Sequence, residues 1–112
     1  MISFGDIVLT RFPFTDLSDS KMRPALVISR DNNRRSDVVL AFITSNTTAA
    51  TADSISIQPD AGNGLKVPSI VRFDKLATLE KRVIAGTLGK ADPAFLAAAQ
   101  PIFFGVFGFG TP

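Results

Sequence analysis

The sequence predicts a mostly β protein: a small antiparallel barrel of the SH3-like size class with one helix near its C-terminus. Three observations favour this fold. Short apolar runs rich in strand-forming residues recur along the chain and are separated by clusters of turn residues. Only one segment, late in the chain, has the capping residues and composition of a helix. The length of 112 residues suits a single domain, 1–112. A β-sandwich is the alternative architecture.

About six strands are expected between residues 5 and 90, each a run of apolar or alternating residues bounded by turn residues. The predicted strands are 6–12, 24–30, 38–45, 54–58, 68–73 and 83–88. Pro24 opens the second of them, which suits a position where the strand needs no backbone N–H. The segment 54–58 alternates polar and apolar residues, as a strand with one buried face does.

The predicted helix covers about residues 92–100. Asp92 can cap it, Pro93 fits its first turn, and the alanine-rich stretch that follows favours a helix. A proline inside a helix removes a hydrogen bond and clashes with the preceding turn, so we expect the helix to end before Pro101. Residues 101–112 then form an apolar tail, whose phenylalanines we expect to pack in the core or in a dimer interface.

The composition excludes several kinds of chemistry. The chain has no cysteine and no histidine, which rules out a disulfide scaffold, a thiol nucleophile and metal sites built on thiolates or imidazoles. Catalysis would depend on Arg, Lys, Asp, Glu, Ser or Thr. The net charge of +2 permits contact with a nucleic acid but does not require it. No segment has the pattern of a secretory signal or of a membrane span, so we expect a cytoplasmic protein without membrane contact.

A polar loop at residues 15–23 is a candidate binding element. It is long for a hairpin connection and ends with Arg23, next to Pro24 at a strand entrance. Loops of this kind on rigid barrels often carry function. A solvated loop in which Arg23 pairs with Asp16 or Asp19 accounts for the same residues, and this alternative stays open.

Two further groups of residues can take part in chemistry. Thr44 and Ser45 end an apolar strand, where their hydroxyls can bind a phosphate or a ribose, although such residues also simply end strands. Arg72 and Asp74 lie on one face of a predicted strand, with Phe73 pointing the opposite way into the core. A structural ion pair would explain that pattern equally. The basic loop at 30–35 is interpreted as a solvated turn.

Five segments together resemble the MazF/PemK family of toxin endoribonucleases from toxin–antitoxin modules. They occur in the family's order between residue 5 and about residue 100: G-D-I-V-L at 5–9, R-P-A-L-V-I-S at 23–29, F-I-T-S at 42–45, G-L-K-V-P-S-I-V-R-F-D-K-L at 64–76 and L-G-K at 88–90. The F-P-F-T-D sequence at 12–16 is similar to a divergent branch of the family. The resemblance implies an SH3-like barrel, as in PemK and the related toxin CcdB, that forms a symmetric homodimer.

By the same resemblance, the protein would inhibit growth by cleaving single-stranded RNA, including mRNA, at short sequences without a metal ion or cofactor. The 2′-hydroxyl would attack the adjacent phosphorus and leave a 2′,3′-cyclic phosphate and a 5′-hydroxyl end. The implied partners are single-stranded RNA, a cognate antitoxin with an acidic C-terminal segment, and a second copy of the chain. Two alternatives remain: a non-enzymatic, CcdB-like toxin that binds gyrase, and an inactive homologue that only binds RNA.

The resemblance also implies roles for the matched positions. Asp74 would be the base, Arg72 the acid, and Arg23 the stabiliser of the phosphate, while Thr44 and Ser45 would position phosphate and ribose. The other candidate substrate-binding residues are Thr15, Lys21 and Pro24.

Overall fold

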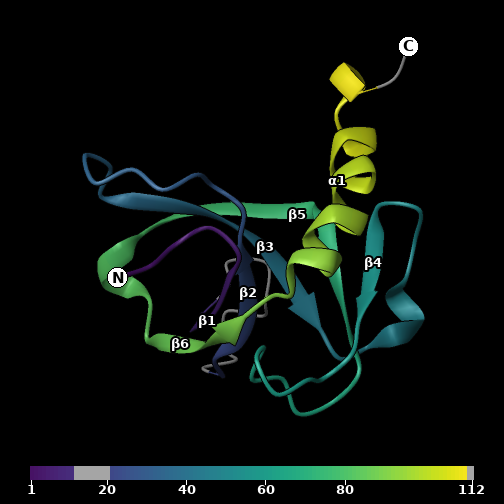
Figure 1. Ribbon diagram of the computed structural model, residues 1–112, viewed down its shortest axis with the longest axis horizontal. Helices are drawn as coiled ribbons and strands as arrows, with labels where there is room; N and C mark the ends of the chain where they lie inside the picture. Colours follow the sequence, from purple (N-terminus) through teal and green to yellow (C-terminus); the bar gives the residue numbers. More distant parts are fainter. Residues whose placement is uncertain (12–20, 111–112) are drawn as a thin grey trace.

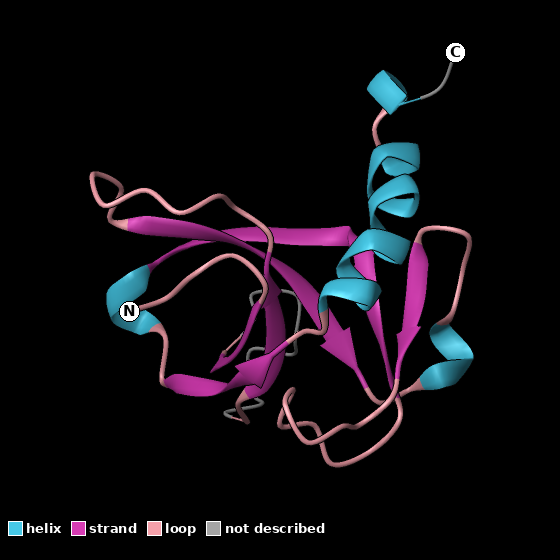
Figure 2. Ribbon diagram, viewed as in Figure 1, coloured by secondary structure: helices cyan, strands magenta, loops and turns pink. Residues whose placement is uncertain are grey.

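A single, strongly curled antiparallel sheet forms most of the molecule in the computed structural model, which describes residues 1–11 and 21–110 (Figure 1). Its six strands are β1 (Asp6–Thr10), β2 (Arg23–Val27), β3 (Asp37–Thr44), β4 (Ser54–Ile57), β5 (Ser69–Glu80) and β6 (Gly86–Lys90). The strand order is β4-β5-β3-β2-β1-β6. One α-helix, α1 (Pro93–Val106), and three short 3₁₀ turns, η1 (Thr47–Ala49), η2 (Lys81–Val83) and η3 (Gly108–Gly110), complete the described chain (Figure 2). The predicted mostly β fold with a C-terminal helix is confirmed, and the β-sandwich is not adopted.

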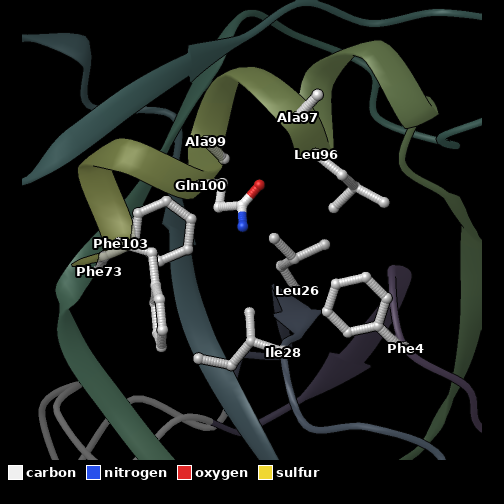
Figure 3. Close-up of a pocket in the computed structure, with 9 residues that line it drawn as sticks. All are labelled: Phe4, Leu26, Ile28, Phe73, Leu96, Ala97, Ala99, Gln100 and Phe103. Carbon is white, nitrogen blue, oxygen red and sulfur yellow. The ribbon is translucent and has the colours of Figure 1, made fainter. Parts of the chain in front are cut away.

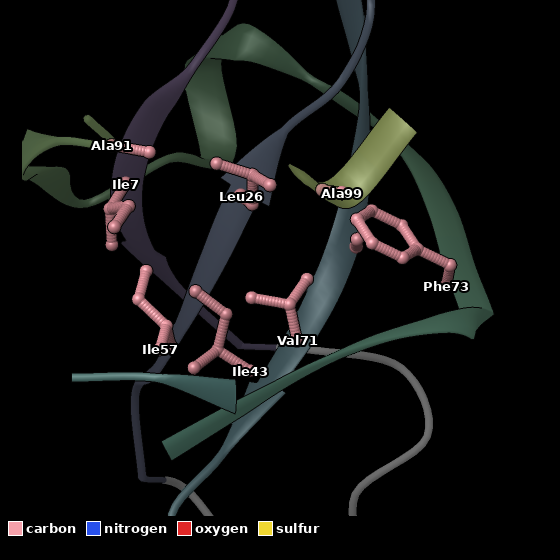
Figure 4. Close-up of a cluster of buried hydrophobic side chains, with 9 residues drawn as sticks. Ile7, Leu26, Ile43, Ile57, Val71, Phe73, Ala91 and Ala99 are labelled. Carbon is pink, nitrogen blue, oxygen red and sulfur yellow. The ribbon is translucent and has the colours of Figure 1, made fainter. Parts of the chain in front are cut away.

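Each face of the sheet carries a cluster of buried apolar side chains. For this reason most strands have continuous apolar sequences rather than an alternation of polar and apolar residues. The first cluster lies between the sheet and α1 and includes Ile7, Leu26 and Phe73 (Figure 4). The second lies on the other face and includes Val8 and Val27. Because successive strand residues point to opposite faces, neighbours such as Ile7 and Val8 contribute to different clusters.

The longest strand, β5, bends sharply where its pairing with β3 is interrupted. Ala41 pairs with Leu76, whereas the next residue of β3, Phe42, pairs with Arg72. Residues 73–75 therefore have no partner on β3, and β5 changes direction there. The predicted strand 68–73 stopped too early, because the second half of β5 continues along β3 as far as Glu80.

The predicted strand 83–88 is wrong at its start. Lys81–Val83 forms η2, and β6 begins only at Gly86. The backbone must reverse direction between β5 and β6, and this turn is held by hydrogen bonds from the Lys81 N–H to the Ser36 carbonyl (2.8 Å) and from the Ala85 N–H to the Leu9 carbonyl (2.8 Å).

The helix begins as predicted but does not end before Pro101. Asp92 caps it by accepting a hydrogen bond from the Ala94 N–H (2.9 Å), and α1 then continues through Pro101 to Val106. Pro101 cannot donate to the preceding turn, which costs stability. Packing compensates for this loss, since Phe103 and Val106 contact the first core cluster.

Phe103 is the centre of an aromatic contact that holds the second half of α1 to the sheet. Its ring meets Phe73 edge to face, with ring centres 5.8 Å apart, and Phe107 with ring centres 5.2 Å apart. The apolar segment predicted as a tail is thus largely helical, and part of it packs in the core. In the described chain no helix combines the length and the apolar character needed to cross a bilayer.

Candidate functional site

An open cleft of about 750 Å³ lies at the ends of β2 and β3. β2 contributes Arg23 and Pro24 to its lining, while Thr44 and Ser45 come from the end of β3 and the residue after it. The segment 64–67 and the side chain of Leu88 in β6 provide further lining. Four of the predicted site residues are therefore gathered around one concave surface.

The register of the sheet explains why Arg23 and Thr44 meet. Ala25 of β2 pairs with Phe42 of β3, and Arg23 and Thr44 each lie two residues beyond this pair, on adjacent strands that line the same cleft. Side chains two residues apart on a strand share a face, and directly paired residues do so as well. Both Arg23 and Thr44 are half-buried, at the rim of the face that carries the second core cluster.

Arg72 lies on the same face of the sheet, one strand further along. It pairs with Phe42 across β3 and β5, which makes it a diagonal neighbour of Thr44. Diagonal neighbours of this kind lie about 7–8 Å apart. The sheet thus brings Arg23, Thr44 and Arg72 to one face, although Arg72 and Asp74 are not among the described residues that line the cleft.

Arg72 and Asp74 form a two-pronged ion pair. The Arg72 Nε donates to Asp74 Oδ1 (3.1 Å) and its Nη2 donates to Asp74 Oδ2 (2.7 Å). Phe73 between them is 2% exposed and points into the core, as predicted, whereas the side chains of Arg72 and Asp74 are 18% and 29% exposed. The packing of Phe73 in the core therefore holds in place the strand segment that carries Arg72 and Asp74.

This ion pair changes the acid–base properties of both partners. The hydrogen bond to Asp74 is the main cause that raises the pKa of Arg72 above its usual value. The same bond lowers the pKa of Asp74 below its usual value of 3.8. Asp74 is consequently ionised at neutral pH, as a proton acceptor must be, and Arg72 is a stable cation with little tendency to release a proton.

The end of β3 is fixed by the hydroxyl of Thr44. Its Oγ1 accepts a hydrogen bond from the Asn46 N–H (3.1 Å), and the Asn46 Oδ1 in turn accepts one from the Thr48 N–H (3.2 Å) at the start of η1. The Thr44 hydroxyl accepts this bond with its oxygen, so its proton can still be donated to a ligand. Thr44 thus ends the strand and also presents a donor to the cleft.

The remaining predicted residues differ in what the structure says of them. Lys21 is exposed, two residues before Arg23, and is not among the described residues of the cleft. Thr15 lies outside the described residues, and so do Asp16 and Asp19, the alternative partners considered for Arg23. In the basic loop, Arg35 pairs with Asp37 at 2.7 Å, in keeping with a solvated turn.

Sequence reasoning did not single out Lys66, an exposed residue that lines the cleft. It lies beyond Gly64, where the backbone has a φ of +75° and where a Cβ atom would come within 2.2 Å of the Leu88 carbonyl oxygen. Only glycine fits such a position. The Gly-Asn-Gly sequence at 62–64 lies between the predicted strands 54–58 and 68–73, and its two glycines are the signal that could identify a tightly docked segment.

A second cavity, of about 350 Å³, lies between α1 and the sheet (Figure 3). Its lining is apolar apart from Gln100 and consists of Phe4, Leu26, Ile28, Phe73, Leu96, Ala97, Ala99, Gln100 and Phe103. None of its described lining residues is charged. Across the described ranges, 1–11 and 21–110, no three acidic side chains come together as a metal site would require.

Comparison of the sequence with models of known protein families finds a match to one family. A model of the PemK-like, MazF-like toxins of type II toxin–antitoxin systems matches residues 3–101. No curated protein sequence matches the chain.

Several solved structures share the fold. An endoribonuclease in complex with its cognate antitoxin, from a mycobacterial species, is 20% identical over 100% of both chains, with a TM-score of 0.79. The toxin MazF-mt6 of Mycobacterium tuberculosis is 22% identical over 91% of this chain and 95% of its own, with a TM-score of 0.74. MazF of Deinococcus radiodurans is 22% identical over 96% of each chain, with a TM-score of 0.74.

Proposed function

The chain belongs to the PemK-like, MazF-like toxins of type II toxin–antitoxin systems, and from this premise we propose that it is an endoribonuclease that cleaves single-stranded RNA. The observation that most supports the proposal is the cleft that brings Arg23, Thr44 and Ser45 together, with Arg72 and Asp74 on the same sheet face. Two cations, two hydroxyls and one ionised carboxylate suffice for RNA cleavage when the substrate supplies its own nucleophile.

The proposed reaction is an internal transfer at phosphorus. Asp74 accepts the proton of the RNA 2′-hydroxyl, and the freed oxygen forms a bond to the adjacent phosphorus. Arg23 stabilises the extra negative charge on the phosphorane, while Thr44 and Ser45 orient the phosphate and the ribose. The bond from phosphorus to the 5′-oxygen then breaks, which leaves a 2′,3′-cyclic phosphate and a 5′-hydroxyl end.

The role of Arg72 differs in this proposal from the one that the resemblance implies. Its hydrogen bond to Asp74 raises its pKa, which makes it a poorer acid. We therefore assign to Arg72 the stabilisation of negative charge and the orientation of Asp74, and the departing 5′-oxygen takes its proton from water. No step requires a metal ion, since the carboxylate removes the proton and the guanidinium groups balance the charge.

Dimerisation and antitoxin binding belong to the same proposal. Two copies related by a two-fold axis would join their shallow clefts into a groove long enough for several nucleotides. The cations of the groove would attract an acidic C-terminal segment of the antitoxin, which would compete with RNA for the same surface. Light scattering at micromolar concentration should give the mass of a dimer, and a monomer would remove the groove from the proposal.

A cleavage assay tests the activity directly. Purified protein is incubated with a mixed pool of single-stranded RNA in the presence of EDTA, and the ends of the products are identified. Cleavage to 2′,3′-cyclic phosphate ends is expected, and substrates with a 2′-deoxy group at the scissile position should remain intact. Cleavage of the deoxy substrate would show that water is the nucleophile, and RNA binding without cleavage would identify an inactive homologue.

A further inference from the structure

The turn that precedes the cleft-lining segment 64–67 is organised around one buried side chain, Asn63, which is only 1% exposed. The Asn63 Oδ1 accepts hydrogen bonds from the N–H groups of Asp60 (3.2 Å) and Leu65 (2.9 Å). The Nδ2 donates to the Gln58 carbonyl (2.8 Å). A single carboxamide therefore joins the beginning and the end of the turn.

Backbone contacts hold this turn tightly against β6. The Lys90 N–H donates to the Gly62 carbonyl (2.8 Å). A Cβ atom on Gly89 would come within 2.2 Å of the Gly62 carbonyl oxygen, and one on Gly64 would come equally close to the Leu88 carbonyl oxygen. The turn and the strand thus meet backbone to backbone, with no room for side chains between them.

The turn leads directly into the segment that carries Lys66. On its N-terminal side this segment is fixed by the bond between Leu65 and Asn63. On its C-terminal side the Ser69 Oγ donates to the Val67 carbonyl (3.0 Å). Lys66 and Arg23 line the same cleft, so a phosphate group held between them requires a defined separation of their cations.

We propose that Asn63 is a positioning residue for RNA binding: it fixes the segment 64–67 so that the Lys66 ammonium contacts the RNA backbone. This inference rests on the proposed endoribonuclease function. Asn63 itself is buried and does not touch RNA, so its contribution passes through Lys66. A misplacement of about 1 Å in a binding group can cost about 10²-fold in activity.

The first test concerns the turn alone and needs no RNA. In Asn63→Ala the Asp60 and Leu65 N–H groups lose their acceptor, so their protection against hydrogen exchange should fall about 10- to 100-fold, while the amides of β1 to β3 stay protected. Asn33→Ala, at an exposed asparagine in the basic loop, is the matched control and should change nothing. Unchanged protection of Asp60 and Leu65 would overturn the proposal.

The second test asks whether the effect reaches RNA through Lys66. Asn63→Ala should raise the KM for RNA about tenfold and change kcat much less, and the same substitution should have little further effect in a Lys66→Ala background. Equal effects in both backgrounds, or loss of protection with unchanged KM, would overturn the positioning role and leave the proposed nuclease intact. A parent protein that neither binds nor cleaves RNA would refute the nuclease, and with it the role of Asn63 in RNA binding.

If the Asn63→Ala variant does not fold, the Asn63→Asp variant is used in its place. Its carboxylate still accepts from the two N–H groups but cannot donate to Gln58, so an intermediate KM is expected. A KM equal to that of the parent would contradict the inference.

Discussion

Two regions contribute to the cleft, and they are built by different interactions. The strand region, with Arg23 and Thr44 at the cleft and Arg72 on the same sheet face, obtains its geometry from backbone pairing across β2, β3 and β5. Asp74 follows Arg72 in a part of β5 that has no partner on β3, and its ion pair with Arg72 holds it. The turn region, 58–67, obtains its geometry from side-chain hydrogen bonds and close backbone contacts centred on Asn63. The strand region is therefore positioned mainly by strand pairing. The turn depends instead on hydrogen bonds of the Asn63 and Asp60 side chains and on its backbone contacts with β6.

This difference leads us to expect different roles. Strands in the interior of a sheet hold reacting groups more precisely than turns do. The reacting groups proposed here all lie on or directly after strands, and the turn supplies a binding cation. Substitutions in the strand region should therefore lower kcat, and substitutions in the turn should raise KM.

The largest effect is expected for Asp74→Asn. The amide oxygen can still accept one hydrogen bond from Arg72, but the amide cannot take up the proton of the 2′-hydroxyl, so kcat should fall about 10²- to 10⁴-fold. Single-turnover cleavage of a defined RNA measures it. The control is Asp37→Asn, which removes the negative charge from the comparable pair with Arg35 at the other end of β3. An Asp74→Asn enzyme with the parent's kcat would remove Asp74 from the mechanism.

Arg23→Ala should have the next largest effect. Loss of a group that stabilises charge in the transition state lowers kcat about 10²- to 10³-fold. Because Arg23 is half-buried at a strand end, outside both core clusters, the melting temperature should stay close to that of the parent. Arg34→Ala, in the exposed basic loop, is the matched control. Cleavage within a few-fold of the parent would make Arg23 a purely structural residue.

The same comparison shows what the sequence could and could not predict. Strand-borne residues follow the alternation of side chains along a strand, so the opposite orientations of Phe73 and its neighbours Arg72 and Asp74 were predictable. That Arg23 and Thr44 meet depends on the register of β2 against β3, which a single sequence does not display. The resemblance to a family supplied that link.

Other features depend on tertiary packing and escaped prediction. The helix was expected to end before Pro101, because local propensity disfavours proline there, but the contact of Phe103 with Phe73 compensates for the missing hydrogen bond. The role of Asn63 was also hidden, since an asparagine between two glycines is typical of any exposed turn. Its burial results from the docking of that turn on β6.

A smaller effect is expected for Lys66→Ala in the turn region. One phosphate contact is lost, so KM should rise several-fold with kcat nearly unchanged, and the slope of log affinity against log salt should decrease by about 0.7. RNA binding measured at several salt concentrations tests this. A fall in kcat without a change in KM would contradict the expectation that the turn region affects binding and the strand region affects the chemical step.

The smallest effect is expected for the contribution of the Arg72–Asp74 ion pair to stability and for its dependence on pH. The folded protein holds the pKa of Asp74 below its value in the unfolded chain. The pair with Arg72 therefore stabilises the fold at any pH above the unfolded pKa of Asp74. This stabilisation is lost as the pH falls through the lower pKa of the folded state. Partly exposed pairs contribute about 1 kcal/mol or less. Denaturant unfolding should show Asp74→Asn slightly less stable than the parent at neutral pH, and this difference should shrink as the pH falls through the folded pKa of Asp74. A difference that grows in acid would contradict the direction of the pKa change.

The contact between Phe73 and Phe103 also has a consequence for the order in which the molecule is made. Ribosomes synthesise the chain from its N-terminus, so Phe103 is added 30 residues after Phe73. Phe73 lies between Arg72 and Asp74 and packs against that late residue. The strand segment that carries the ion pair therefore acquires its full packing only after Phe103 has been added. A shorter nascent chain can already contain every proposed catalytic residue and still lack the support that holds two of them in place.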